Sequence, residues 1–546
     1  MPATPCETQD ASALRWNLLD EALIRWRSIE DGSLHHSSLS QLLAAMANLQ
    51  VYDFPALRPH QRHPWHAFLV QLGAIALHHA GQSEPWQQTD AWRAALLALT
   101  PDDPDGAAWC LVTPADRPAL LQAPVPGETP QRWSNVIHAA DALDMLVTSK
   151  NHDLKAARAR QAQADDWLFA LVSLQTQEGF LGAGNYGISR MNGGFASRPG
   201  VGVAPIGSWS QRWQSDIASL LLQREHIAST YGLVHAGGHA LLWLLPWSGT
   251  DALTLQSLDP FYIEICRRVR LAAPHGQLMA HVTGSKVARI DAKQSNGVTG
   301  DAWTPMETAK AKALTVSRNG FDYRLMSELL TGDTYTMGAA WRLNPWPQGT
   351  SLQAIAQATV RGQGKTEGYH ERRVPIPPRM RLMLISGQRP QLAAMAQKRV
   401  KAIAEMRKLL WSALTVLFAN GESSGGNDAV SDRASRYAQP FEQREDRLFF
   451  ADLQQEIDAE ETQREEVYLQ WLLALAARAE QVLRHAFIAG PRSNMQRYKA
   501  QSAALSRFDA GLRSSKSFPE LANHFARQRA SRTAHAASDS EGAHHA

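Results

Sequence analysis

The chain has 546 residues, of which 44% are hydrophobic and 20% charged, a composition typical of a folded protein that is too long for one hydrophobic core. Lys and Arg total 55 against 52 Asp and Glu, and this net charge of +3 excludes a histone-like polycation while allowing local basic patches. The three cysteines are scattered and no signal peptide is recognisable, so we expect a cytoplasmic protein without a disulfide framework.

The larger part of the chain mixes short strands and helices. We expect a flexible leader over 1–12 and then a large, irregular α+β domain over 13–388. Hydrophobic periodicity and turn residues predict helices beginning at Ser38 and at Pro64, and further helices over about 140–146, 165–177 and 210–228. Strands are predicted at 22–26, 109–112, 277–282, 314–316, 321–325 and 354–360.

The last part of the domain plan is helical. Apolar residues spaced 3, 4, 4 and 3 apart form one stripe on a long helix, which ends at Asn420-Gly421: Ile403, Met406, Leu410, Leu414 and Leu417. Further helices are predicted over about 439–458, 463–489 and 492–512. Four helices in series indicate an all-α four-helix bundle over 389–515, followed by a partly disordered tail over 516–546.

A glycine-rich segment at 179–202 is the most informative stretch of the sequence. Seven glycines, with Gly202 closing the run, exclude a regular helix or strand and predict a loop. Glycines let backbone N–H groups approach a partner closely, and Arg190 and Arg198 supply positive charge. This combination favours contact with a nucleic-acid backbone or groove, although a long structural loop is the alternative on composition alone.

Three other polar stretches are candidates for nucleic-acid contact. SKVARIDAK contains Lys286, Arg289 and Lys293, and the stretch 361–381 holds six Arg and Lys against two Glu. The run TSKNHDLK at 148–155 is also polar. Solvated loops are the alternative for each of them. The first bundle helix also carries Lys398 and Lys401 away from its apolar stripe, as a candidate basic outer face.

No motif for catalysis is complete. GQGKT at 362–366 is similar to part of a P-loop, but Thr359 stands where the pattern requires its first glycine. Histidines near 63–79 lack a set of cysteines or carboxylates that would complete a metal site. We therefore expect a protein that is not an enzyme and needs no cofactor or metal; the alternative is a nucleic-acid-acting enzyme, either a metal-dependent nuclease or an NTPase.

Several of these stretches together resemble the CasA family, the large subunit of the type I-E Cascade complex in CRISPR immunity. The resemblance covers nearly the whole chain and depends on FPALRPHQRHPWHAFLVQLGAIAL, TSKNHDLK, LQTQEGFLGAGNYGISRMNGGFASRPGVG and RGQGKTEGYHERR. It implies a non-enzymatic subunit that recognises the protospacer-adjacent motif on double-stranded DNA, assists duplex opening and R-loop formation, and docks the helicase–nuclease. The implied partners are the other Cascade subunits, the guide RNA and the target DNA.

The resemblance also assigns residues. The family's minor-groove glycine loop corresponds to Asn192, Gly193, Gly194 and Phe195, and a motif-contacting lysine corresponds to Lys286. The strand-separating wedge aligns near Lys365 and Thr366, where this chain has neither the Asn nor the Gln of the family. The loop that contacts the guide RNA and the rest of the complex corresponds to Lys150, Asn151 and His152. Contacts with the nucleic-acid backbone are expected from Arg190, Arg198, Arg289, Lys293, Arg361, Arg372, Arg373, Lys398 and Lys401.

Overall fold

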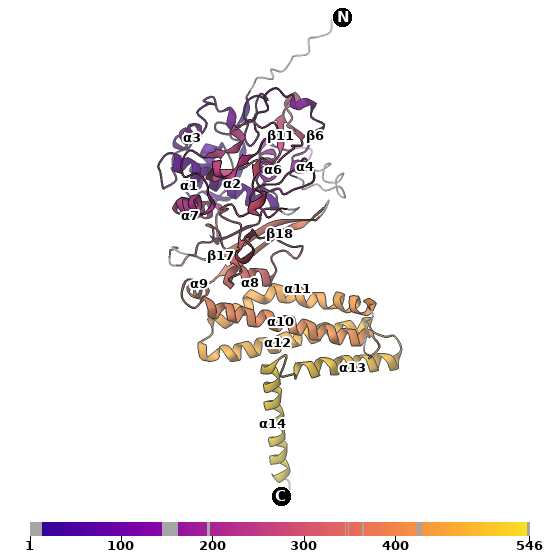
Figure 1. Ribbon diagram of the computed structural model, residues 1–546. Helices are drawn as coiled ribbons and strands as arrows, with labels where there is room; N and C mark the ends of the chain where they lie inside the picture. Colours follow the sequence, from indigo (N-terminus) through magenta and orange to yellow (C-terminus); the bar gives the residue numbers. More distant parts are fainter. Residues whose placement is uncertain are drawn as a thin grey trace. The chain divides into compact units, whose positions relative to one another are not determined.

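The computed structural model describes residues 14–144, 162–193, 197–343, 346–347, 349–362, 365–422 and 428–542. The chain divides into two compact units (Figure 1). The first unit comprises Met1–Phe321 and Asp333–Ile376, and the helical unit comprises Asp322–Gly332 and Pro377–Ala546. The sequence predicts a second domain that begins at 389; the helical unit comprises the chain from Pro377 onward and a segment from within the range predicted for the first domain.

The core of the first unit is built around one buried helix, α2. Every residue of α2 from His63 to Leu77 is buried, as expected for a helix that is covered on all sides. It packs against α6, α7 and β10. The predicted start at Pro64 agrees with the structure, in which α2 spans Arg62–His79. The other helices of this unit are α1 (Leu39–Ala47), α3 (Thr89–Ala98), α4 (Ala140–Leu143), α6 (Ala164–Gln177) and α7 (Trp209–Tyr231).

The strands of the first unit form several sheets of two or three strands each. The longest strands belong to the sheet β18–β17–β7, in which β17 (Leu352–Gly362) pairs antiparallel with both β18 (Lys365–Ile376) and β7 (Gly200–Pro205). The remaining strands are β1 (Arg15–Asn17), β2 (Ile24–Ser28), β3 (Leu34–Ser37), β4 (Val51–Asp53), β5 (Cys110–Val112), β6 (Asn135–Ile137), β8 (His239–Leu241), β9 (Leu253–Thr254), β10 (Leu258–Ile263), β11 (Arg268–Ala272), β12 (Met279–Thr283), β13 (Ile290–Asp291), β14 (Met306–Glu307), β15 (Lys312–Ala313) and β16 (Tyr335–Thr336).

Two predicted strands are wrong, and the first of them, at 321–325, leads into a helix. The Asp322 side chain accepts a hydrogen bond from the backbone N–H of Leu325 and caps helix α8 (Tyr323–Thr331). The short run of apolar residues around Asp322 resembles the pattern of a strand. The N-terminal cap formed by Asp322 favours the helix instead. The predicted strand at 314–316 is also absent: the neighbouring strand β15 ends at Ala313.

The helical unit confirms the predicted bundle. Its helices are α9 (Pro378–Ile385), α10 (Arg389–Phe418), α11 (Asp428–Asp458), α12 (Arg464–His485), α13 (Asn494–Leu512) and α14 (Pro519–Gly542), together with α8. Helix α10 contacts α11, α12 and α13, which lie side by side in Figure 1. The predicted apolar stripe is buried along α10, with 0% exposure from Ile403 to Leu417 at its five positions. The fold is therefore an irregular α+β unit followed by a helical bundle.

Residues 519–542 of the predicted tail form helix α14, and the expectation of partial disorder over 516–546 stays a prediction. Phe518 and Leu521 are buried at the start of this helix, which contacts α12. The alanines that follow favour a helix over a coil. Composition rich in Ala, Ser and His therefore indicated low complexity without excluding regular structure.

Helix α8 is expected to decide whether a truncated chain containing the first unit stays soluble. Its apolar side, with Met326, Leu329 and Leu330, is buried in the helical unit. Ending the chain after Ile376 exposes this side, so we expect aggregation on size-exclusion chromatography. Replacing 322–332 with a Gly/Ser linker in the same truncated chain is the matched control, and we expect a soluble monomer. Two equally soluble truncations would contradict the assignment of α8.

Candidate nucleic-acid interface

The glycine-rich loop (residues 179–199) leaves α6 and enters β7. Its first half is folded on itself by backbone hydrogen bonds: the N–H of Leu181 donates to the carbonyl of Asn185, and the N–H of Ile188 donates to that of Glu178. This part of the loop is therefore ordered by its own backbone.

A buried polar cluster anchors the loop at Ser189 and Arg190. The N–H of Ser189 donates to Glu264 Oε2 at 2.8 Å, and Arg190 Nη2 donates to the carbonyl of Tyr262 at 2.7 Å. The Arg190 guanidinium lies 3.6 Å from the centre of the Tyr262 ring and 3.4 Å from Glu264. Burial raises the pKa of Glu264, and the charge of Arg190 opposes that shift.

A second buried anchor holds the other end of the loop. Arg198 makes a bidentate ion pair with Asp301, at 2.6 Å from Nε and 2.5 Å from Nη2, and its side chain is 0% exposed. Burial alone would raise the pKa of the Asp301 carboxyl, but the charge and hydrogen bonds of Arg198 lower it to about 2. Ser197 adds a link to β17, because its Oγ donates to the carbonyl of Thr359 and accepts from that residue's N–H.

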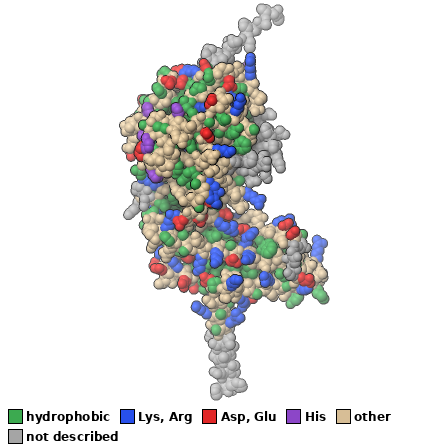
Figure 2. All heavy atoms as spheres, viewed as in Figure 1, with side chains coloured by type: hydrophobic (Ala, Val, Ile, Leu, Met, Phe, Trp, Pro, Cys, Tyr) green, Lys and Arg blue, Asp and Glu red, His purple; other side chains and the backbone are tan. Residues whose placement is uncertain are grey.

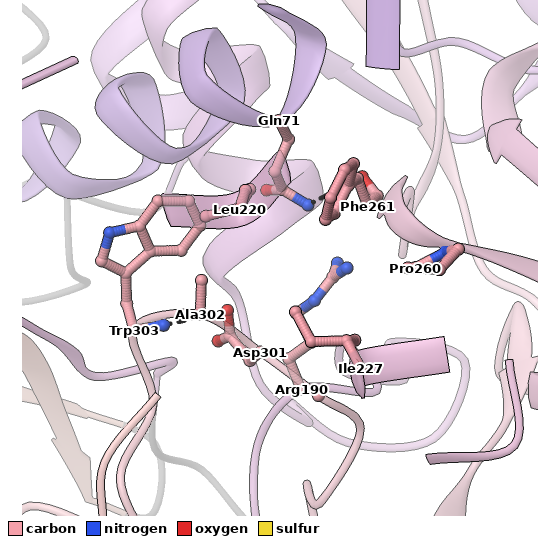
Figure 3. A pocket seen from close by; sticks show the side chains of 10 residues that line it. Gln71, Arg190, Leu220, Ile227, Pro260, Phe261, Asp301, Ala302 and Trp303 are labelled. Carbon is pink, nitrogen blue, oxygen red and sulfur yellow. Dashed lines mark hydrogen bonds between the residues drawn. The ribbon is translucent and has the colours of Figure 1, made fainter. Parts of the chain in front are cut away.

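The two anchors lie close together in the core. Figure 3 shows Arg190 and Asp301 facing the same small cavity, with Gln71 and Phe261 on its far side. The cavity has a volume of about 10 Å³, which leaves room for at most one water molecule. Arg190 is 3% exposed and Arg198 is 0% exposed. Both arginines hold the loop in place, so we do not retain them as contacts to a nucleic-acid backbone.

A short exposed stretch lies between the anchors. Asn192 is partly exposed and Gly193 is exposed, with φ at +49° and open space where a side chain would extend. A positive φ is the conformation that glycine adopts without strain. Gly194 and Phe195, the other two predicted motif-recognition residues, lie outside the described residues. The anchors thus present 192–193 to solvent from a rigid base.

Lys286 is brought to the glycine-rich loop by contacts that the sequence did not reveal. The Tyr186 hydroxyl donates to the carbonyl of Lys286 at 2.9 Å, and the N–H of Ser285 donates to the carbonyl of Gly184 at 3.0 Å. A Cβ on Gly284 would lie 3.3 Å from the Cα of Gly184, so the two backbones approach closely because neither residue has a side chain. The Lys286 side chain is exposed beside the loop.

The other residues of SKVARIDAK separate into two kinds. Arg289 is buried, donates to the carbonyls of Leu245 and Pro246, and lies over the Trp247 ring, so it is a structural residue and we withdraw it as a backbone contact. Lys293 is exposed in the short 3-10 helix Lys293–Ser295 and stays a candidate.

The basic stretch at 361–373 forms the end of the β17–β18 hairpin. Gly362 pairs with Lys365 and Arg361 with Thr366, next to an irregularity in register at Val360. The side chains of 361–367 lie outside the described residues, so the predicted roles of Arg361, Lys365 and Thr366 stay predictions. The GQGKT motif thus joins two antiparallel strands, which is not the strand–loop–helix arrangement of a P-loop.

Two more predicted residues lie on β18. Arg373 is exposed and donates from Nε to Glu371 Oε1 at 2.7 Å, and Arg372 donates to the carbonyl of Phe321 at 3.4 Å. Because Ser197 is bonded to Thr359, the end of the glycine-rich loop runs beside β17 near the hairpin tip. The structure therefore places the end of the glycine-rich loop beside β17 of the hairpin, and the backbone of Lys286 against the first half of the loop.

The remaining predicted residues lie elsewhere. In the helical unit, Lys398 Nζ is 2.9 Å from Glu520 Oε1 and 3.7 Å from the centre of the Tyr468 ring, and Lys401 is exposed. Basic and acidic side chains are interspersed on the face of this unit drawn in Figure 2. Lys150, Asn151 and His152 lie outside the described residues.

Sequence reasoning missed Tyr186, Glu264 and Asp301, the residues that fix the loop. Each is a single residue without a spacing pattern, so only the folded structure relates Glu264 and Asp301 to arginines far away in the chain. Within the described ranges no group of three or more His, Cys, Asp and Glu is placed to hold a metal ion. No helix in those ranges combines the length and apolar character needed to cross a membrane.

Comparison with solved structures identifies the fold. The chain matches no protein-family model and no curated protein sequence. It is similar to CasA (Cse1) of Thermus thermophilus, with a TM-score of 0.61, 13% identity, and coverage of 92% of this chain and 99% of that one. For Cse1 of Acidimicrobium ferrooxidans the values are 0.62, 15%, 91% and 98%, and for Cse1 of Thermobifida fusca they are 0.59, 14%, 93% and 98%.

The α+β unit with a C-terminal helical bundle is thus the architecture of a known class of CRISPR-associated proteins. The chain has the CasA (Cse1) fold over more than nine-tenths of its length. The resemblance expected from the sequence is confirmed for the fold.

Proposed function

We propose that this chain is the non-catalytic large subunit of an RNA-guided Cascade complex of type I-E. In this role it recognises the protospacer-adjacent motif on double-stranded DNA, assists duplex opening and R-loop formation, and docks the helicase–nuclease. Its partners are the other Cascade subunits, the guide RNA and the target duplex, in the cytoplasm. The CasA fold supports the proposal that the chain is part of a Cascade complex. The candidate interface described above supports the proposed contact with DNA.

The observation that carries the proposal is the exposed stretch at 192–193, which two buried ion pairs hold between Lys286 and the hairpin sheet. The backbone of a glycine such as Gly193 can approach the floor of a minor groove about 6 Å wide, where the pattern of donors and acceptors separates mainly A·T from G·C. Lys286 adds a positive charge beside that groove. Arg361, Lys365 and Thr366 at the hairpin tip are proposed to separate the strands next to the motif.

A library of duplexes with randomised flanking motifs, presented to the assembled complex with guide RNA, tests the proposal. We expect enrichment of a small family of motifs, because minor-groove recognition is degenerate. Uniform recovery of all motifs would contradict a role in motif recognition.

The alternative, an enzyme that acts on nucleic acid, predicts metal-dependent cleavage or ATP turnover by the isolated chain. Under this alternative, Lys365→Ala would abolish the ATP turnover. We expect neither activity from the isolated chain.

Lys286 gives a prediction about salt dependence. Lys286→Ala removes one cation from the interface, so the slope of log affinity against log salt concentration for duplex binding is expected to fall by about 1. Lys310→Ala is the matched control, since Lys310 is an exposed lysine of the same unit that pairs with Glu307. Filter-binding titrations at several salt concentrations measure the slope. Equal slopes for both variants would show that Lys286 does not contact the DNA.

A further inference from the structure

A separate cavity in the first unit is lined by three arginines from three elements. It has a volume of about 190 Å³, and we call it the arginine pocket. Arg62 begins α2, Arg212 lies in the first turn of α7, and Arg373 lies on β18. Alternate residues of β17 form one wall: Gln353, Ile355 and Gln357. Neither residues 192–193 nor Lys286 lines this pocket.

Arg212 is the most enclosed of the three cations, with a side chain that is 12% exposed. Its ion-pair partner Asp216 is 3.9 Å away, and Asp216 Oδ2 already accepts hydrogen bonds from His66 Nε2 and Trp303 Nε1. Burial lowers the pKa of the Arg212 guanidinium, Asp216 opposes this shift, and Arg373 adds to it. The positive charge of Arg212 is therefore only partly compensated by the protein.

The other charges around the pocket leave an excess of cations. Glu371 Oε1 accepts from Arg373 Nε at 2.7 Å, and Glu371 Oε2 lies 3.6 Å from Arg62 Nη1. Asp53 also lines the pocket, but it is paired with Arg27 at 2.6 Å. Among the residues that the structure describes, the carboxylates next to the three arginines are thus Glu371 and Asp216, while Asp53 is paired with Arg27.

The pocket also has polar and aromatic groups that suit an organic ligand. Gln357 lines the pocket next to Glu371, and its side-chain amide donates to Glu371 Oε2 at 3.1 Å. Ser208, the cap of α7, places the positive end of that helix at the same wall. Tyr52 and Trp209 contribute aromatic surface.

We propose that the arginine pocket binds the terminal phosphate of a nucleotide, either free or at the end of a nucleic-acid strand. Guanidinium groups bind phosphate oxygens through paired N–H donors, and a helix N-terminus adds to their attraction. The aromatic wall offers a stacking surface for a base. A terminal phosphate has one ester link and enters a concave site more readily than an internal one. This inference does not depend on the proposed role in motif recognition.

Isothermal titration calorimetry on the full chain tests the proposal. A nucleoside 5′-monophosphate is expected to bind saturably, and the matching nucleoside at least tenfold more weakly. Arg212→Gln and Arg373→Gln are each expected to weaken the monophosphate at least tenfold. Glu371→Gln is expected to strengthen it several-fold, because a competing carboxylate is removed.

Arg132→Gln is the matched control, because Arg132 is an exposed arginine of the same unit that does not line the pocket. We expect it to bind the monophosphate like the unchanged chain. Since Arg373 is exposed, its variant keeps the test valid even if the Arg212 variant folds poorly.

A short oligonucleotide with and without a 5′-phosphate identifies the source of the phosphate. If the phosphorylated strand binds at least tenfold more tightly than the mononucleotide, the ligand is a strand end; the reverse order indicates a free nucleotide. Equal affinities for monophosphate and nucleoside, or no loss in either arginine variant, would overturn the proposal.

Discussion

Gly193→Asp is expected to weaken binding of a motif-bearing duplex by the assembled complex by ten- to a hundredfold, or roughly 1.4–2.8 kcal/mol. The carboxylate would extend from an exposed backbone position that we place against DNA, where it meets phosphate charge at short range. Among the described residues, apart from its chain neighbours, nothing lies within 4 Å of a Cβ built at this position, so the substitution is not expected to disturb the packing of the first unit. Electrophoretic mobility shifts with the assembled complex measure the affinity.

Gly193→Asn is the matched control for this prediction. Asn and Asp have nearly the same shape and both tolerate a positive φ, so backbone strain is common to the two variants and charge is the difference. We expect the Asn variant to retain most of the affinity. If the Asp variant assembles and binds the duplex as tightly as the Asn variant, residue 193 does not lie against DNA.

Arg198→Met is expected to destabilise the first unit by about 3–5 kcal/mol, because it leaves the buried Asp301 carboxylate without its ion-pair partner. Urea denaturation followed by tryptophan fluorescence measures the change. The double variant Arg198→Met with Asp301→Asn is expected to recover part of the loss, since the unpaired charge is removed. A loss below about 1 kcal/mol in the single variant would show that the pair does not hold this end of the loop.

The same ion pair predicts a dependence of stability on pH. The pKa of Asp301 is about 2 in the folded chain, below its ordinary value of 3.8. Its contribution of about 2 kcal/mol is therefore present above pH 4 and lost as the pH falls from 4 to 2. In Arg198→Met, burial raises the pKa of Asp301, so acidification toward pH 4 should stabilise the variant relative to neutral pH. If the free energies of unfolding of the unchanged chain and of Arg198→Met change with pH in the same way, the pH dependence does not come from the Arg198–Asp301 pair.

The sequence predicted those parts of the fold in which local pattern and packing agree. The stripe from Ile403 to Leu417 and the helix that begins near Pro64 are examples, because a 3.6-residue period and a start signal are both local. The strand expected at 321–325 was wrong, because the hydrogen bond from Asp322 to the start of α8 outweighs a short apolar run. The sequence did not predict the helix over 519–542, because composition does not reveal that Phe518 and Leu521 are buried at its start.

The segments of the candidate interface could be predicted from the sequence, but the long-range contacts that hold them together could not. Glycine density marked the loop, and charge marked Lys286 and the hairpin. Charge did not separate an exposed lysine from the buried Arg190, Arg198 and Arg289, because partners such as Glu264 and Asp301 are distant in sequence. Long-range pairing of this kind has no local signal.

Electron cryomicroscopy of the complex assembled with guide RNA on a motif-bearing duplex tests the shared interface most directly. We expect the minor groove of the motif to lie against residues 192–193, with Lys286 beside it and the tip of the β17–β18 hairpin at the point where the strands separate. A duplex that is bound elsewhere, with 192–193 and Lys286 left in solvent, would contradict the interface.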